Sequence, residues 1–165
     1  LIANELMVAL DNALENFVKM REVEGAKLIE DIESRIHVIE TKVEEITKYS
    51  STLVEEYIQK LETRVKELMK DTVVDEARLM QEIVIFSDKS SIEEELTRLA
   101  SHISQFLTLI KESSPIGKKI DFLIQEINRE VNTIGSKANC LDITNRVIEL
   151  KTEIENIREQ IQNIE

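Results

Sequence analysis

The sequence predicts an all-α protein built from long antiparallel helical hairpins with coiled-coil-like seams. Only three Gly and one Pro occur in 165 residues, which excludes glycine-rich phosphate loops and many-turned β folds. Apolar residues make up 42% of the chain and charged residues 33%, whereas aromatic residues contribute only 4%. The apolar residues recur at steps of three and four, which is the period of an amphipathic helix.

Residues 1–70 are predicted to form a long helical hairpin. Apolar residues of the first stretch follow steps of four and three, at Leu6, Leu10, Ala13, Phe17 and Met20. The stripe falters near Gly25 and resumes as an Ile-rich heptad seam over residues 29–46. A break is expected at residues 49–52, because Ser and Thr are preferred N-caps, and a second helix would then follow over residues 53–68.

Residues 71–165 are predicted to form a second helical domain, which begins with a short helix from about Asp75 to Phe86. The next helix is expected to open at Ser91, whose spacing to Glu94 fits a capping box. Its core stripe consists of Ile92, Leu96, Leu99, Ile103, Phe106 and Ile110. This domain also contains the two helices with the most regular apolar patterns.

The first of these two helices is expected to start at Ser114-Pro115, since Ser can cap a helix and Pro suits its first position. It should end at Gly135 or Lys137, with a core arc of Ile116, Ile120, Leu123, Ile124, Ile127, Val131 and Ile134. A turn flanked by Asn139 and Asp142 leads to the last helix. Its heptad register comprises Ile143, Val147, Leu150, Ile154, Ile157, Ile161 and Ile164.

The narrow Ile-rich seams at 29–46 and 143–164 present more apolar surface than one chain is expected to cover. The sequence therefore predicts an oligomeric assembly. No apolar run is long enough to span a bilayer, no secretory segment is present, and the single Cys140 excludes an internal disulfide framework. These features predict a cytoplasmic protein without a membrane partner.

The distribution of charge singles out residues 115–139. The chain carries a net charge of −12, yet this stretch has four cations and three carboxylates, a net of +1. A polar face lies opposite its core arc and comprises Lys118, Asp121, Gln125, Arg129 and Asn132, flanked by Lys119, Glu126, Glu130 and Lys137, with Phe122 among them. Such a face offers donors for phosphate and base edges and a ring for stacking. The alternative is a solvated helix face.

Local spacing shows few catalytic motifs. No Walker loop, nucleophile elbow or dinucleotide fingerprint occurs. One Cys and two His that lie 65 residues apart offer no zinc ligand pair. Mg²⁺ or Mn²⁺ needs only one or two protein oxygens besides substrate phosphates. His102 has the intrinsic pKa range of a general acid or base, and the alternative is a surface His beside Arg98 and Glu95.

The stretch PIGKKIDFLIQEINREVNTIGSKAN, residues 115–139, resembles the signature of the YicC/YloC family of bacterial stress-associated endoribonucleases. Residues 20–25, 94–102 and 147–165 are similar to further stretches of that family. The resemblance implies a metal-dependent RNA endonuclease of the bacterial cytoplasm, assembled as a ring that we expect to be a hexamer. It also implies an N-terminal α/β domain, which we expect to be absent from this chain.

On this interpretation the chain is the C-terminal helical part of an endoribonuclease that acts on RNA, and DNA is not expected as a partner. The face geometry suggests Asp121, Glu126 and His102 as catalytic residues, and Asp121, Glu126 and Glu130 as ligands of Mg²⁺ or Mn²⁺. It suggests RNA contacts by Lys118, Lys119, Phe122, Gln125, Arg129, Asn132 and Lys137. The alternative function is a non-catalytic helical assembly or adaptor module that binds a protein partner. The acidic net charge favours this alternative, because it opposes RNA binding unless the basic groups are focused.

Overall fold

A computed structural model describes residues 2–68, 75–112, 117–138 and 140–162. Within these ranges it contains helices and no strand, which confirms the predicted all-α class. The helices are α1 (Ile2–Leu68), α2 (Glu76–Ser90), α3 (Glu93–Leu109), α4 (Gly117–Lys137) and α5 (Leu141–Ile161). No helix in the described ranges is both long and apolar enough to cross a bilayer.

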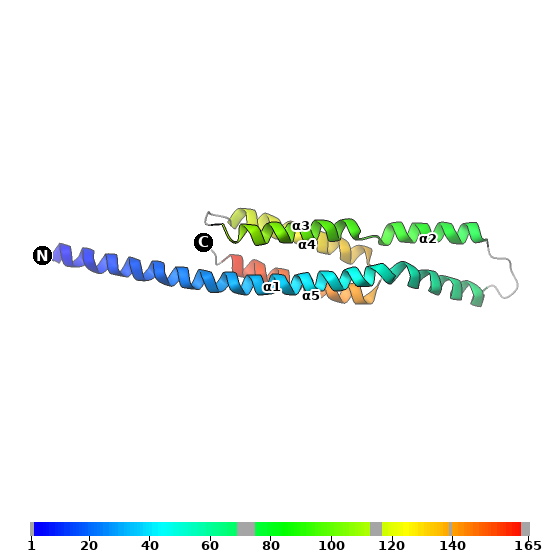
Figure 1. Ribbon diagram of the computed structural model, residues 1–165, viewed down its shortest axis with the longest axis horizontal. Helices are drawn as coiled ribbons and strands as arrows, with labels where there is room; N and C mark the ends of the chain where they lie inside the picture. Colours follow the sequence, from blue (N-terminus) through cyan, green and yellow to red (C-terminus); the bar gives the residue numbers. More distant parts are fainter. Residues whose placement is uncertain (1, 69–74, 113–116, 139, 163–165) are drawn as a thin grey trace.

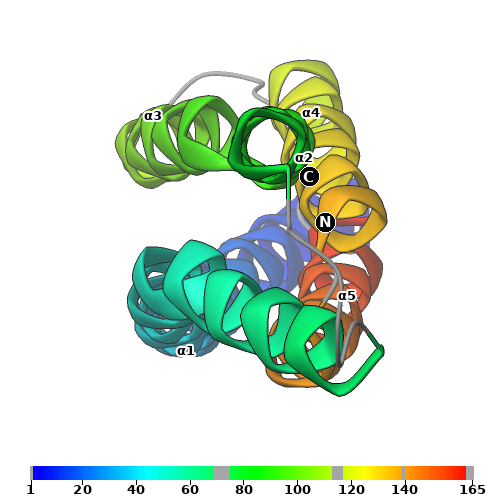
Figure 2. The same cartoon turned by 90° about the vertical axis from the view of Figure 1, so that its right-hand side faces the viewer.

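The molecule is an elongated bundle whose length is set by α1 (Figure 1). Helix α5 runs antiparallel to the middle of α1. The antiparallel α3–α4 hairpin packs on this pair, with α4 against α5 and α3 against α1. Helix α2 continues the line of α3 and returns along the C-terminal part of α1. In the end-on view the order around the bundle is α1, α5, α4 and α3 (Figure 2). The most extensive contacts join α3 to α4, α1 to α5 and α4 to α5.

The core consists of the predicted apolar stripes of four helices. Buried side chains of α1 and α3 are Ile32, Ile36, Ile39, Ile46, Leu99, Ile103 and Phe106. Those of α4 and α5 are Ile120, Leu123, Ile124, Ile127, Val131, Ile134, Ile143, Val147, Leu150, Ile154, Ile157 and Ile161. The predicted heptad register of the last helix is therefore confirmed as far as residue 161. Other predicted features lie outside the described residues, namely Ser114, Pro115, Ile116, Asn139 and Ile164.

The predicted break at residues 49–52 is wrong, because α1 continues through it as one helix. The Ser51 hydroxyl donates to the Lys48 carbonyl and the Thr52 hydroxyl to the Tyr49 carbonyl, so both side chains bond within the helix instead of capping a new one. Within residues 2–68 the chain is therefore a single helix and not the predicted hairpin. The turn back comes after α1, and the Tyr57 and Phe86 rings stack between α1 and α2 with centroids 3.6 Å apart.

The predicted capping box at Ser91 is also wrong. Helix α2 extends past Phe86 to Ser90, and Ser91 is its C-cap, with its N–H donating to the Ser87 carbonyl. Helix α3 begins after Ile92, which makes no side-chain cap bond. Two other boundaries agree with the sequence. The Asp75 side chain caps α2, and α4 ends at Lys137.

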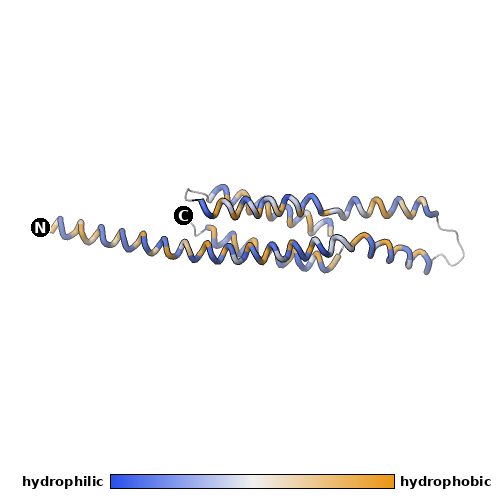
Figure 3. The backbone as a smooth tube through the Cα atoms, viewed as in Figure 1, coloured by the Kyte–Doolittle hydropathy of each residue, from blue (hydrophilic) through white to orange (hydrophobic). Residues whose placement is uncertain are grey.

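The apolar surface that remains uncovered lies where it was not expected. The seams at 29–46 and 143–161 are buried within a single chain, because α1 and α5 pack against each other. They therefore give no reason to expect an oligomer. The N-terminal part of α1 instead projects beyond the bundle with alternating apolar and polar turns (Figure 3). We name its apolar residues the N-terminal stripe; each is more than half exposed, and they are Ile2, Leu6, Met7, Val8, Leu10, Leu14, Phe17, Val18, Met20 and Val23.

Candidate metal centre between α3 and α4

The α3–α4 hairpin brings together three side chains able to bind a metal. Among the described residues, His102 of α3 and Glu126 and Glu130 of α4 place one ligand atom each within 4.8 Å of the others. Glu126 and Glu130 are four residues apart and therefore lie one above the other on the same face of α4. That face is turned towards α3, whose polar stripe presents His102.

The electrostatics of this group favour a bound cation. Glu130 is only 5% exposed, and two carboxylates at this spacing on one helix repel each other. Arg98 approaches Glu130 with 3.8 Å between Nη1 and Oε1, and Arg129 approaches Glu126 with 3.7 Å between Nη1 and Oε2. Both distances exceed the usual length of a hydrogen bond, so neither arginine saturates its carboxylate.

The imidazole of His102 also has an unfilled bonding position. Its Nδ1 is buried and has no hydrogen-bond partner within the described part of the chain. A buried nitrogen without a partner costs free energy, which the binding of a ligand can recover. One imidazole nitrogen and two carboxylates suit a divalent transition metal, because imidazole prefers such ions and carboxylates also accept Mn²⁺ and Mg²⁺. The residues present therefore fit a divalent cation.

A second polar contact closes the hairpin beside this group. Lys137 Nζ lies 2.7 Å from Glu95 Oε1 and donates to the Ser91 carbonyl at 3.1 Å. Burial disfavours the charged form of Glu95, but the hydrogen bond from Lys137 and the positive charges of Lys137 and Arg98 outweigh it. The pKa of Glu95 therefore lies below its ordinary value. Lys137, which the sequence suggested as an RNA contact, instead binds α3 through its ammonium group.

The remaining suggested RNA contacts lie on the outward face of α4. They are Lys118, Lys119, Phe122, Gln125, Arg129 and Asn132, and all of them are exposed. Phe122 is 60% exposed, which is unusual for a large apolar side chain and keeps its ring available for stacking. Arg129 belongs to both regions, because it is exposed and also approaches Glu126. The outward face and the metal group are therefore adjacent.

The structure separates Asp121 from the other suggested ligands. Asp121 is exposed and lies outside the group of His102, Glu126 and Glu130. Residues five apart on an α-helix point about 140° away from each other, so Asp121 and Glu126 face different directions. His102 joins the two glutamates although it is 24 residues from Glu126, which no local spacing reveals. Arg98 was not assigned to the site from the sequence. Its position four residues before His102 could have indicated it, because residues at this spacing share a face of a helix.

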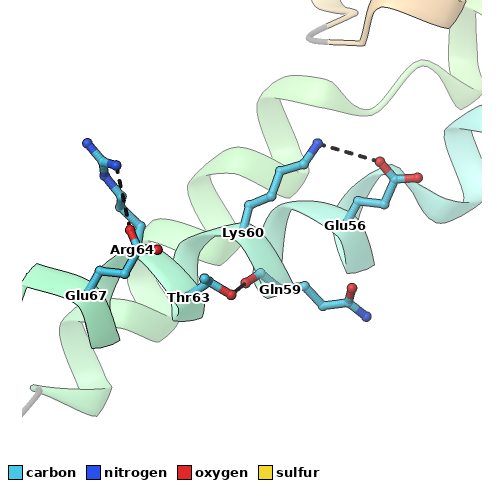
Figure 4. A pocket seen from close by; sticks show the side chains of 6 residues that line it. All are labelled: Glu56, Gln59, Lys60, Thr63, Arg64 and Glu67. Atoms are coloured by element: carbon cyan, nitrogen blue, oxygen red, sulfur yellow. Dashed lines mark hydrogen bonds and ion pairs between the residues drawn. The ribbon is translucent and has the colours of Figure 1, made fainter.

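A polar hollow near the C-terminal end of α1 is a weaker candidate (Figure 4). Its lining residues are Glu56, Gln59, Lys60, Thr63, Arg64 and Glu67. The charged ones pair along the helix, Lys60 with Glu56 and Arg64 with Glu67, each at 3.8 Å. All six residues are exposed. Exposed pairs of this kind are ordinary features of a helix surface and indicate no particular chemistry.

Comparison with known proteins identifies the family to which the chain is related. Residues 46–165 match the family described as "Endoribonuclease YicC-like, C-terminal". The chain is 52% identical over 166 residues to a protein of Clostridioides difficile named "Probable endoribonuclease YicC", a match that covers 100% of the chain and 57% of that protein. A protein of the same name from Haemophilus influenzae is 34% identical over 164 residues, covering 99% of the chain and 56% of the relative. The chain thus spans just over half the length of these relatives.

Proposed function

The chain belongs to the YicC-like endoribonuclease family, and on this premise we propose that it is the C-terminal helical part of a metal-dependent endoribonuclease. The observation that carries the proposal is the group of His102, Glu126 and Glu130, whose ligand atoms lie within 4.8 Å of one another. The names of the two relatives support RNA as the substrate. The resemblance to bacterial proteins of this family supports the bacterial cytoplasm as the compartment.

In this proposal the three residues hold one divalent cation. Mn²⁺ is favoured over Mg²⁺, because imidazole is a better ligand for the softer ion. A bound cation of this kind polarises a phosphodiester and lowers the pKa of a coordinated water. Glu130 is buried and fixes the position of the site, whereas Glu126 is partly exposed and can accept a proton on the side of the solvent. Glu126 would bind the cation through one carboxylate oxygen, and its second oxygen would take the acid–base role.

The outward face of α4 supplies the RNA contacts. Lys118, Lys119 and Arg129 interact with phosphates, Gln125 and Asn132 with sugar or base edges, and Phe122 stacks on a base. Arg129 stands between this face and Glu126, so a strand that follows the cations reaches the metal group. Three of the four cations of residues 115–139, a stretch of net charge +1, lie on this face, which makes RNA binding compatible with an acidic chain.

We further propose that the protein is a homo-oligomer, as the family resemblance implies with its expected hexameric ring. The N-terminal stripe supports an assembly, because exposed apolar rows of this length mark contact sites. The same stripe also favours the second candidate function, a helical adaptor that binds a protein partner without cleaving RNA.

RNA cleavage by the full-length protein tests the proposal. We expect an end-labelled RNA to be cut when Mn²⁺ is added and to remain intact when a chelator removes it. Glu130→Gln should abolish most cleavage while helicity is unchanged. Glu82→Gln, an exposed carboxylate of α2, serves as the matched control and should cleave like the wild type. Cleavage that persists in Glu130→Gln would place the chemistry outside the group of His102, Glu126 and Glu130, and the absence of any cleavage by wild type would favour the adaptor.

A further inference from the structure

Arg98 lies at the edge of the metal group and contacts two carboxylates. It lies on α3 one turn before His102, and its Nη1 is 3.8 Å from Glu130 Oε1. Its other terminal nitrogen, Nη2, pairs with Glu94 Oε1. The arginine side chain is 54% exposed and that of Glu94 is 69% exposed, whereas that of Glu130 is only 6% exposed. One guanidinium therefore spans a buried carboxylate and a solvated one.

Neither of the two contacts of Arg98 holds its side chain firmly in place. A buried carboxylate needs a positive charge nearby, and Arg98 is the cation paired with Glu130 in the part of the chain that the structure describes. The contact with Glu130 is nevertheless too long for a hydrogen bond, so the two groups attract each other without being locked. The contact with Glu94 is an exposed pair within one helix, which contributes little stability. Arg98 can therefore leave Glu130 if another cation replaces it there.

We propose that Arg98 stands in for the divalent cation at Glu130 in the metal-free protein, and that it binds the RNA phosphate once the cation has taken Glu130. A guanidinium suits this second role, since its planar fork matches two phosphate oxygens. Its half-exposed position one turn from His102 places the fork at the rim of the metal group. The inference rests on the proposed function and adds to it the residue that couples metal binding to substrate binding.

Competition between Arg98 and the cation has a consequence that a purely structural role of Arg98 would not produce. If Arg98 and the cation compete for Glu130, removal of Arg98 leaves the metal-free carboxylate unpaired and raises the affinity for the cation. The same change removes a phosphate contact and lowers the affinity for RNA. The two affinities therefore move in opposite directions, whereas damage to the α3–α4 hairpin would weaken both.

The test compares Arg98→Gln with wild type in the full-length protein. Mn²⁺ affinity is measured without RNA by calorimetry, and binding of a fluorescent RNA oligonucleotide is measured at saturating Mn²⁺ by stopped flow, before cleavage takes place. We expect Arg98→Gln to bind Mn²⁺ more tightly and the oligonucleotide more weakly, each by a factor on the order of five or more. Arg78→Gln, an exposed arginine of α2, is the matched control and should change neither affinity.

Arg98→Lys keeps the charge but loses the fork, so it should weaken oligonucleotide binding and leave the Mn²⁺ affinity close to that of wild type. This variant decides the matter if Arg98→Gln loses helicity. Unchanged or weaker Mn²⁺ binding by Arg98→Gln, together with normal metal-dependent cleavage by wild type, would overturn the role of Arg98 alone. If wild type neither binds Mn²⁺ nor cleaves RNA, the proposed function fails as well, and that outcome is recognised from the wild-type protein without any variant.

Discussion

Lys137 Nζ lies 2.7 Å from Glu95 Oε1, and this contact joins the last turn of α4 to the first turn of α3. It holds the open end of the hairpin that carries the candidate metal group. Because the carboxylate is buried and the lysine is two-thirds covered, the pair is more than a solvated surface contact. It also converts a suggested ligand-binding lysine into a part of the scaffold.

The pair predicts a dependence of stability on pH. The pKa of Glu95 is lower in the folded protein than in the unfolded chain, so its ionised form favours folding. This contribution is present above the unfolded pKa of about 4.3 and is lost as the pH falls through the folded pKa. We expect Glu95→Gln to lower the melting temperature at pH 7 and to flatten its decline below about pH 5. If the melting temperature of Glu95→Gln changed with pH in parallel with that of wild type, this assignment would be contradicted.

Lys137→Met tests the same contact from the other side. The change leaves the buried Glu95 carboxylate without its hydrogen bond, at an expected cost of about 1–3 kcal/mol in unfolding free energy. Lys151→Met is the control, because Lys151 is an exposed lysine of α5. Denaturant unfolding at neutral pH measures both. An equal and small effect in the two variants would show that the Lys137 contact contributes nothing.

Two glycines predict opposite effects of the same substitution. A Cβ at Gly135 would lie 2.9 Å from Val147 Cγ1, so α4 and α5 approach too closely there for alanine. A Cβ at Gly25 would meet nothing within 4 Å. We expect Gly25→Ala to stabilise the protein by about 0.5–1 kcal/mol through helix propensity. Gly135→Ala should destabilise it by up to about 2 kcal/mol, because overpacking exceeds that gain. Thermal denaturation measures the stability of both variants. Stabilisation by both would refute the close approach of α4 and α5 at Gly135.

Substitution of the suggested ligands should separate Asp121 from Glu126. Glu126→Gln and His102→Ala remove members of the group and are expected to lower Mn²⁺ affinity at least about tenfold, the usual effect of losing a supporting group at a metal site. Asp121→Asn is exposed on another face and should bind Mn²⁺ like wild type. Calorimetric titration of the full-length protein compares the three. A loss confined to Asp121→Asn would move the metal to the outward face of α4.

The outward face of α4 is tested through Arg129. Its side chain is 74% exposed, so Arg129→Ala should leave packing undisturbed. A phosphate contact releases about one counterion, so the variant should weaken binding of unrelated RNA sequences alike and reduce the salt slope by about one unit. Arg64→Ala, another exposed arginine on α1, is the control. Binding curves of Arg129→Ala that superimpose on wild type at every salt concentration would exclude the contact.

The N-terminal stripe predicts how the protein assembles. We expect the wild type to be an oligomer at micromolar concentration, and the double substitution Leu10→Glu with Phe17→Glu to reduce its mass by disrupting the exposed row. Val84→Glu changes an equally exposed apolar residue of α2 and should leave the mass unaltered. Light scattering coupled to gel filtration measures all three. A monomeric wild type would rule out the assembly.

The periodicity of the sequence by itself determined the helices and their buried faces. The register from Ile143 to Ile161 and the core arc from Ile120 to Ile134 were correct, because the 3.6-residue repeat decides which side chains share a face of one helix. For the same reason, sequence spacing alone places Glu126 and Glu130 together. The family resemblance likewise resides in the order of residues 115–139 and needs no knowledge of their packing. Predictions of helix ends were weaker, because Ser51 and Thr52 satisfy their hydroxyl groups inside α1 as easily as at a cap.

Only the tertiary structure decided which faces of different helices meet. Packing of Phe106, Leu99 and their neighbours on α4 sets how far α3 is rotated and shifted along its axis. That setting brings His102 to the two glutamates and Lys137 to Glu95, while Asp121 remains in solvent. The period of a single helix contains no information about rotation relative to a neighbour, since each of its faces is equivalent until side chains interlock. The metal group is therefore a property of the packed hairpin.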